Sequence, residues 1–311
     1  MLRSIGWRRR NGRRGGAWMA AVLCAGTLVL GGAVSADELD RIRQAGKIVV
    51  AHRESSFPFS YLDDAKRPVG YAMDLCSRLV AAIRARLNQP DLPVEYLLVT
   101  SSSRVPAIAE GKASLECGST TNTAERRRQV DYTVPHFVSS ARFLVKTQAG
   151  IARIEDLAGK RVISTKGTTS LAVFKTRDKE LHLNATVLEA DDHAAAFAAV
   201  VEGRADAFVM DDVLLFGQRA LAAKPDDYVV VGKPLTIEPY AIMLPRNEPA
   251  FKALVGDEMR RLIRTGELQR LYTQWFERPV PPKRVNMQMP MPFLLRDSLK
   301  FPSERVGDLD G

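Results

Sequence analysis

Hydrophobic positions in the first half of the chain follow two spacings. Short apolar runs typical of strands occur at residues 47–52, 94–99 and 113–117. Between residues 71 and 87, apolar side chains recur at helical spacing, which predicts an amphipathic helix with one buried face. A shorter helix is expected at residues 103–110. Strands that alternate with helices in this way predict an α/β lobe with a mostly parallel sheet.

The same alternation recurs in a second block. Strands are expected at residues 161–165, 185–189 and 205–210, and helices at residues 168–176 and 191–201. Two β-rich segments, residues 141–146 and 240–244, flank this block and are predicted to be paired crossover strands between two lobes. Helices at residues 248–265 and 267–276 would then return the chain to the first lobe, so the second lobe is an insertion into the first.

The predicted fold class is therefore α/β, with two α/β lobes joined by a two-strand hinge. The expected bounds are residues 1–36 for an export signal, 37–140 and 241–279 for the first lobe, 141–240 for the second, and 280–311 for an extended tail. Ligands bind at the strand ends of open α/β sheets, so the cleft between the lobes is the expected site.

The N-terminus is typical of an export signal. Residues 1–16 contain six arginines and no acid, residues 17–34 are nearly all apolar or small, and Ala33-Val34-Ser35-Ala36 fits a cleavage site after Ala36. A membrane anchor is the alternative, but the apolar stretch is short for a span and ends in the small-residue motif. These features predict a soluble periplasmic protein and leave the choice between the Sec and twin-arginine routes open.

Charge argues against a nucleic-acid partner. The chain has 45 basic and 36 acidic side chains, and removal of the six signal arginines leaves a net charge of about +3. Two cysteines, Cys76 and Cys117, remain after cleavage. An oxidising compartment would let them pair, and two buried reduced thiols are the alternative. Four scattered histidines without a metal-binding spacing predict no metal site.

The segment from Glu116 to Arg126 carries the most chemical information. Its sequence, ECGSTTNTAER, places hydroxyls and backbone amides after a short apolar strand, with an arginine shortly afterwards. Amides at a helix start and a planar guanidinium are both suited to binding a carboxylate. An ordinary strand-to-helix turn beside a solvated arginine run is the alternative.

This segment and other motifs resemble the substrate-binding proteins of polar amino-acid ABC importers (bacterial solute-binding protein family 3), and among them the periplasmic glutamate/aspartate-binding proteins. The other matching motifs are His52-Arg53-Glu54-Ser55-Ser56, Pro58-Phe59-Ser60, Gly70-Tyr71 to Asp74-Leu75, Gly167-Thr168-Thr169-Ser170, Met210-Asp211-Asp212, Val231-Gly232-Lys233-Pro234 and Pro281-Pro282-Lys283. They occur in family order from about Asp37 to Asn286, and the resemblance implies the two-lobed periplasmic binding protein (Venus-flytrap) fold.

The resemblance also implies a ligand set for the two α-groups of an amino acid. Arg126 is expected to bind the α-carboxylate, helped by Thr121 and by Thr168 and Thr169 from the second lobe. A surface arginine run and a plain helix N-cap are the respective alternatives. Asp211 is expected to bind the α-ammonium, with Ser119 as a second acceptor. The alternative for this aspartate is helix capping, for which the neighbouring Asp212 is the better candidate.

Three further positions match those that contact the distal carboxylate in glutamate/aspartate binders. They are Arg53, Arg104 and Ser101. Two guanidiniums near one distal group favour an acidic ligand, because a neutral ligand would leave them buried and unpaired. The alternative is that one of the two arginines pairs with Glu54 or Glu116. His193 matches a family position at the cleft.

The expected function is capture of glutamate or aspartate and its delivery to the membrane permease of an ABC importer, by a monomer that needs no cofactor and performs no catalysis. One alternative is a prephenate- or arogenate-dehydratase-like enzyme on the same fold, which would need a general acid. Another is a binding protein for a different polar amino acid, such as glutamine.

Overall fold

Two five-stranded sheets organise the computed structural model, which describes residues 37–304. The predicted export signal lies outside the described residues. The first sheet has the order β5-β1-β6-β15-β7, in which β1 (Ile48–His52) pairs in parallel with β5 (Val94–Leu98) and β6 (Leu115–Glu116). The late strand β15 (Met243–Pro245) pairs antiparallel with β6 and with β7 (Val130–Tyr132). The parallel pairing predicted for the first three strands of this lobe is confirmed, but β15 makes the sheet mixed, with two parallel and two antiparallel pairings.

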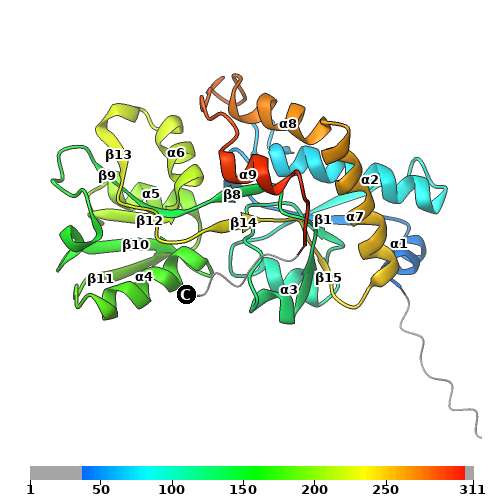
Figure 1. The fold of residues 1–311 in the computed structure, drawn as a ribbon, viewed down its shortest axis with the longest axis horizontal. Helices are drawn as coiled ribbons and strands as arrows, with labels where there is room; N and C mark the ends of the chain where they lie inside the picture. The colour runs from blue at the N-terminus through cyan, green and yellow to red at the C-terminus, as the bar shows by residue number, and fades with distance from the viewer. Residues whose placement is uncertain (1–36, 305–311) are drawn as a thin grey trace, which may run out of the picture. The chain divides into compact units, whose positions relative to one another are not determined.

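Helices from both ends of the described chain belong to this first lobe (Figure 1). They are α1 (Glu38–Ala45), α2 (Tyr71–Leu87), α3 (Arg104–Ala109), α7 (Pro249–Arg264) and α8 (Glu267–Phe276). A small three-stranded sheet, β2 (Ser55–Ser56), β3 (Ser60–Leu62) and β4 (Pro68–Val69), precedes α2. The sequence periodicity placed α2 and α8 at their observed bounds, because each buries a continuous apolar stripe.

The second sheet has the order β11-β10-β12-β9-β13. Its strands are β9 (Ala141–Lys146), β10 (Arg161–Thr165), β11 (Thr186–Ala190), β12 (Ala207–Asp211) and β13 (Tyr228–Val231). The helices of this lobe are α4 (Thr169–Glu180), α5 (His193–Val201) and α6 (Asp212–Leu221), with short 3₁₀ turns at Ile154–Leu157 and Pro225–Asp227. Strands β10, β11 and β12 run parallel, and β9 runs antiparallel to β12 and β13.

The crossover strands are not where the sequence placed them. They are β8 (Phe137–Ser139) and β14 (Glu238–Tyr240), which pair antiparallel and run side by side between the two sheets (Figure 1). The prediction for residues 141–146 is wrong, because β9 is bonded on both sides within the second sheet. Of the predicted 240–244 segment, Tyr240 ends β14 and the remainder leads into β15. The bounds proposed for the two lobes stay predictions.

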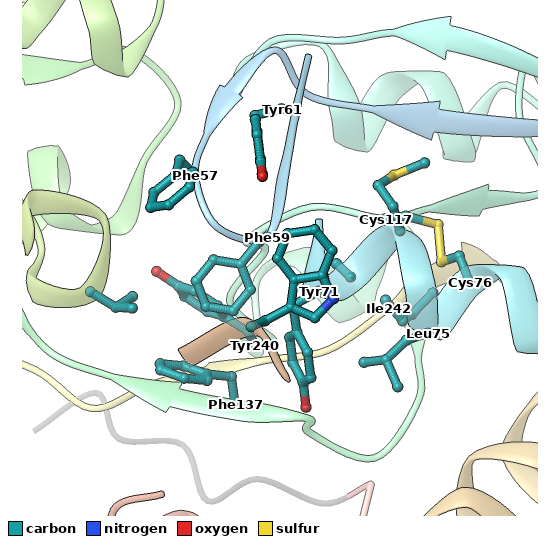
Figure 2. Packing of buried hydrophobic residues seen from close by; sticks show 14 of the residues in the cluster. Phe57, Phe59, Tyr61, Tyr71, Leu75, Cys76, Cys117, Phe137, Tyr240 and Ile242 are labelled. Atoms are coloured by element: carbon teal, nitrogen blue, oxygen red, sulfur yellow. A yellow bond between two sulfur atoms is a disulfide. The ribbon is translucent and has the colours of Figure 1, made fainter. Parts of the chain in front are cut away.

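A disulfide cross-links the first lobe, and an aromatic cluster packs the hinge against this lobe (Figure 2). Cys76 on α2 and Cys117 after β6 are bonded, with their Cα atoms 6.2 Å apart, which confirms the predicted pair. The ring of Phe59 lies 4.9 Å from that of Phe137 on β8 and 5.1 Å from that of Tyr240 on β14. The buried rings therefore fix both hinge strands against the first lobe.

The C-terminal tail differs from the extended segment that was expected. It contains a short helix, α9 (Phe293–Ser298), whose Leu295 is fully buried in the core that also holds the aromatic cluster. A single deeply buried leucine within six residues leaves too little periodicity for sequence reading to detect. Within residues 37–304, the helices are all too short or too polar to span a lipid bilayer.

Candidate functional site

A narrow cavity lies among residues from both lobes. Its lining consists of Ser101, Arg104, Ser119, Thr121, Thr168, Thr169, His193, Met210 and Asp211. Eight of these nine side chains belong to the ten predicted for ligand binding. The other two predicted residues, Arg53 and Arg126, lie beside this group, as described below.

Sheet topology brings these residues together. In the first lobe, Arg53 follows β1, Ser101 and Arg104 follow β5, and Ser119 follows β6, and these three strands are parallel neighbours. In the second lobe, Thr168 follows β10, His193 follows β11 and Asp211 ends β12, again on parallel neighbours. The carboxyl ends of parallel strands meet at one edge, so each lobe presents a cluster of polar side chains to the other.

The two lobes approach each other closely at this site. Gly167 has a left-handed backbone with φ of +72°, and a Cβ atom there would lie 2.8 Å from Cα of Ser102 in the first lobe. Arg126 spans the same boundary, since its guanidinium donates to the carbonyl oxygens of Thr121 at 2.9 Å and Gly167 at 3.1 Å. Arg126 is half-buried and contacts both lobes.

Arg53 and Arg104 are buried cations without a carboxylate partner. They are 1% and 3% exposed, and Arg53 Nη1 and Arg104 Nε have no hydrogen-bond acceptor among the described residues. Arg104 Nη1 donates to the carbonyl oxygen of Ser119 at 3.1 Å. Neither forms an ion pair with Glu54 or Glu116 in the described part of the chain. The alternative pairing left open by the sequence is therefore not formed.

Electrostatics at these arginines favour an incoming anion. Burial lowers the pKa of Arg104 to about 9, the nearby charge of Arg126 lowers it further, and Glu116 opposes the shift. Burial also lowers the pKa of Arg53, and Glu116 is the largest of the acids that oppose this. Both groups remain cationic at neutral pH, and a ligand carboxylate would relieve their desolvation.

Two hydroxyls close to these arginines also lack a partner. Ser101 Oγ and Ser119 Oγ are buried and form no hydrogen bond within residues 37–304. His193 is 1% exposed, with Nδ1 2.8 Å from Thr165 Oγ1 and Nε2 without a partner. Burial and next the charges of Arg53 and Arg104 hold the pKa of His193 well below its ordinary value. A neutral imidazole can therefore either donate to or accept from a ligand through Nε2.

Asp211 is the anionic group of the second lobe's cluster. It is 2% exposed, and its carboxylate accepts from Ser170 Oγ at 2.7 Å and from the Tyr240 hydroxyl. Burial and next the charge of Glu238 raise the pKa of Asp211 to about 7. An ammonium group beside Asp211 would favour its ionised form.

Helix capping was the alternative role for this pair of aspartates. Asp211 stands at the N-cap of α6 but makes no capping hydrogen bond. Asp212, the expected cap, is already helical, and its Oδ1 accepts from Ser139 Oγ at 2.7 Å, on a hinge strand. The prediction that Asp212 caps the helix is therefore wrong, because α6 begins at Asp212 and its carboxylate is bonded to Ser139 on the hinge.

The Ser119 segment and Thr168 also differ in detail from the expectation. No α-helix follows Ser119, since Thr121 forms a β-bridge with Tyr240 and only a 3₁₀ turn occurs at Arg126–Arg128. The predicted helix start is thus absent from this segment. The Thr168 hydroxyl caps α4, accepting from the Leu171 amide and donating to the Thr165 carbonyl oxygen. The plain N-cap alternative therefore describes this hydroxyl.

Sequence reasoning missed Glu238 and Tyr240 on hinge strand β14. Glu238 is 2% exposed, and its Oε2 accepts from Thr121 Oγ1 at 2.6 Å and from Thr169 Oγ1 at 2.8 Å. Tyr240 is fully buried and donates to Asp211. The spacing of two residues puts both side chains on one face of a strand. Tyr240 begins the segment that was expected to cross between lobes, but Glu238 lies outside that segment, and nothing in its sequence context signalled its role.

Comparison with known proteins places this geometry in a family. Residues 48–278 match the profile of the bacterial extracellular solute-binding proteins, family 3. The chain is 40% identical over 285 residues to the L-glutamate/L-aspartate-binding protein of Pseudomonas aeruginosa, covering 90% of this chain and 94% of that protein. It is 40% identical to the glutamate/aspartate import solute-binding protein of Escherichia coli, with coverage of 86% and 89%. No group of three or more metal-ligating side chains occurs among the residues described.

Solved structures give the same fold. A mutant of ArgBP from T. maritima superposes with a TM-score of 0.67 at 25% identity, covering 76% of this chain and 98% of that one. The ancestral amino acid-binding protein AncCDT-1, described as a precursor of cyclohexadienyl dehydratase, superposes with a TM-score of 0.65 at 27% identity, covering 77% and 99%. The chain belongs to the bacterial extracellular solute-binding proteins, family 3.

Proposed function

We propose that this protein captures an acidic L-amino acid, glutamate or aspartate, in the periplasm and delivers it to the membrane permease of an ABC importer. It does so as a monomer without a cofactor and without catalysis. The proposal agrees with the names of the relatives that are 40% identical over most of the chain.

The observation that carries this proposal is the pair of unpaired buried guanidiniums, Arg53 and Arg104. A buried charge is strongly destabilising unless an opposite charge compensates it. Ser101 and His193 add polar groups without partners beside them. A distal carboxylate would bring a negative charge to both guanidiniums, whereas an amide would bring no charge and a cationic side chain would add repulsion.

Roles for the other predicted residues follow from their positions. Arg126 contacts both lobes and is proposed to bind the α-carboxylate together with backbone amides near Thr169. Asp211 and Ser119 are proposed to bind the α-ammonium. The ligand would thus contact both lobes at once, which favours closure of the hinge around it.

Isothermal titration calorimetry with all common amino acids tests the proposal. The protein is unfolded, washed and refolded first, so that carried-over ligand does not mask binding. Glutamate or aspartate should bind at least about a hundredfold more tightly than their amides, the effect expected for an uncompensated buried charge. Tightest binding of glutamine or of a basic amino acid would contradict the assignment of Arg53 and Arg104.

One observation favours a second candidate, a dehydratase-type enzyme. A carboxyl group whose pKa is about 7, as at Asp211, is suited to general-acid catalysis at neutral pH. Binding remains the first candidate, because an ammonium ligand accounts for Asp211 without any reaction. Incubation with prephenate and arogenate, followed by chromatographic detection of product, separates the two: turnover that is lost in Asp211→Asn supports the enzyme.

A further inference from the structure

Glu238 connects the two lobes through a single carboxylate oxygen. Its Oε2 accepts from Thr121, which follows β6 in the first lobe, and from Thr169, which begins α4 in the second. Glu238 itself belongs to hinge strand β14, and the adjacent backbone is fixed by a hydrogen bond from the Asn122 amide to the Pro239 carbonyl oxygen at 2.9 Å. The carboxylate is therefore held where all three parts of the molecule meet.

These two hydrogen bonds determine which way the threonine hydroxyls present their protons. A hydroxyl has one proton to donate and two lone pairs with which to accept, while an ionised carboxylate can only accept. Thr121 and Thr169 both direct their single proton toward Glu238 Oε2. Each hydroxyl is left with lone pairs only for any other partner. Both threonines line the cavity, so this acceptor character is presented to a ligand.

An ammonium group matches this arrangement and a carboxylate does not. An α-ammonium has three N–H donors, and both oxygens of Asp211 already accept one hydrogen bond each, from Ser170 and Tyr240. Ser119 Oγ lies at the same cavity without a partner. Asp211, Ser119 and Thr121 together can supply one acceptor for each N–H donor. A carboxylate facing the Thr121 hydroxyl would instead meet lone pairs and the nearby charge of Glu238.

We propose that Glu238 is a positioning residue for the α-ammonium subsite: it holds the hydroxyl protons of Thr121 and Thr169, so that these hydroxyls accept from the ligand's ammonium group. This deepens the proposed function and rests on it. It also changes the role of these hydroxyls from the one expected from sequence. The α-carboxylate is left to Arg126 and backbone amides.

A pair of ligands that differ only in the α-ammonium tests the inference. Calorimetry measures the dissociation constants of L-glutamate and of glutarate for the refolded full chain and for Glu238→Met, which leaves no oxygen to accept from the two threonines. Loss of the carboxylate should weaken glutamate binding by roughly ten- to one-hundredfold, the range for a hydrogen bond to a charged group. Glutarate, which has no ammonium group, should bind as well or better. The selectivity for glutamate over glutarate therefore falls.

Two further variants separate this role from a structural one. Thr121→Val removes the proposed acceptor and should lower the same selectivity. Glu248→Met is the matched control, because Glu248 is also a buried, hydrogen-bonded glutamate but accepts from the Glu38 backbone amide and from Arg41, and does not line the cavity. It should leave selectivity unchanged.

Three outcomes would overturn the inference. These are an unchanged selectivity in folded Glu238→Met, tighter binding of both ligands by that variant, and an unchanged selectivity in folded Thr121→Val. Tighter binding of both would place Glu238 beside a ligand carboxylate. If the unmutated protein binds neither glutamate nor aspartate, the proposed function fails. The same comparison is then made with the amino acid that does bind and its deaminated counterpart.

Discussion

At the scale of single residues, burial opposes the charges of the side chains that form the site. Arg53 and Arg104 are buried without a carboxylate partner, and the charge of Asp211 is opposed by its burial and by Glu238. Each of these costs falls when a ligand brings the opposite charge. Binding affinity and the stability of the free protein are therefore opposed at the same residues.

Arg104→Met should separate these two effects. An uncharged, unbranched methionine removes the unpaired buried charge, so the melting temperature of the ligand-free protein should rise by a few degrees, roughly the shift for about 1 kcal/mol in a chain of this size. Glutamate affinity should fall by about a hundredfold or more. Differential scanning calorimetry and titration on the same preparation give both quantities. A lower melting temperature would indicate that the Arg104–Ser119 hydrogen bond outweighs the buried charge.

Arg126→Ala should weaken ligand binding far more than substitution of its neighbours. Arg126 contacts carbonyl oxygens of both lobes, and truncating one partner of a hydrogen-bonded charge pair costs about 2–5 kcal/mol. Arg127→Ala is the matched control, since Arg127 bonds Asn122 Oδ1 within its own lobe. Titration with glutamate should show about a thirtyfold loss or more for Arg126 and little for Arg127. Equal losses would favour the surface-charge alternative.

At the scale of secondary-structure elements, the sequence predicted those helices and strands that have a clear hydrophobic periodicity. Helix α8 and strand β10 were located at their observed bounds, and the site residues were found because polar side chains follow apolar strands. The hinge was misplaced because the hydrophobic run of β9 was interpreted as a crossover strand. That run is hydrophobic because β9 is an interior strand of the second sheet, bonded on both sides. Glu238 was missed because a lone acid beside a proline has no distinctive sequence pattern. Its role depends on Thr121 and Thr169, which lie 117 and 69 residues away in the chain.

Helix α6 contains a glycine whose small size allows the lobes to approach. A Cβ atom at Gly217 would lie 2.7 Å from the Phe57 carbonyl oxygen in the first lobe, and Gln218 Nε2 donates to the neighbouring Ser55 carbonyl oxygen at 3.2 Å. Alanine ordinarily stabilises a helix by up to about 1 kcal/mol relative to glycine. At position 217, alanine would stabilise the helix only in conformations in which the two lobes are apart.

Gly217→Ala should therefore weaken ligand binding by about tenfold, which corresponds to a modest steric penalty on the closed form alone. The melting temperature of the ligand-free protein should not fall. Gly256→Ala on α7 is the matched control, because the nearest atoms there, at 3.3 Å, are the ends of the flexible Arg260 and Glu304 side chains. Calorimetric titration and thermal unfolding measure both effects. Equal affinity in Gly217→Ala and the unmutated protein would show that Phe57, in the loop between β2 and β3, moves to accommodate the methyl group.

At the scale of the whole molecule, the hinge, the site and the core are connected by shared residues. Tyr240 packs its ring against Phe59 in the core and donates its hydroxyl to Asp211 in the site. Phe137 on the partner hinge strand packs in the same cluster, beside His136. A change in the charge of a group buried here acts on the stability of the fold and on the position of the hinge together.

His136 makes the stability of the molecule depend on pH. It is fully buried, neither ring nitrogen has a partner within the described residues, and burial lowers its pKa to about 3. Between the folded value and the ordinary value of 6.5, the unfolded chain binds a proton that the folded chain does not. The stability contributed by this neutral imidazole is thus complete above pH 6.5 and is lost as the pH falls toward 3.

His136→Leu isolates this contribution. The pH profile of the unmutated protein mixes it with Asp211, whose pKa is raised to about 7 and which shifts stability in the opposite direction over much of the same range. The difference in unfolding free energy between the variant and the unmutated protein removes the Asp211 contribution. On lowering the pH from 8 to 5, this difference should move by about 2 kcal/mol in favour of the leucine variant. Urea unfolding at both pH values measures it, and a difference that stays constant with pH would mean that His136 gains a proton or a partner in the folded protein.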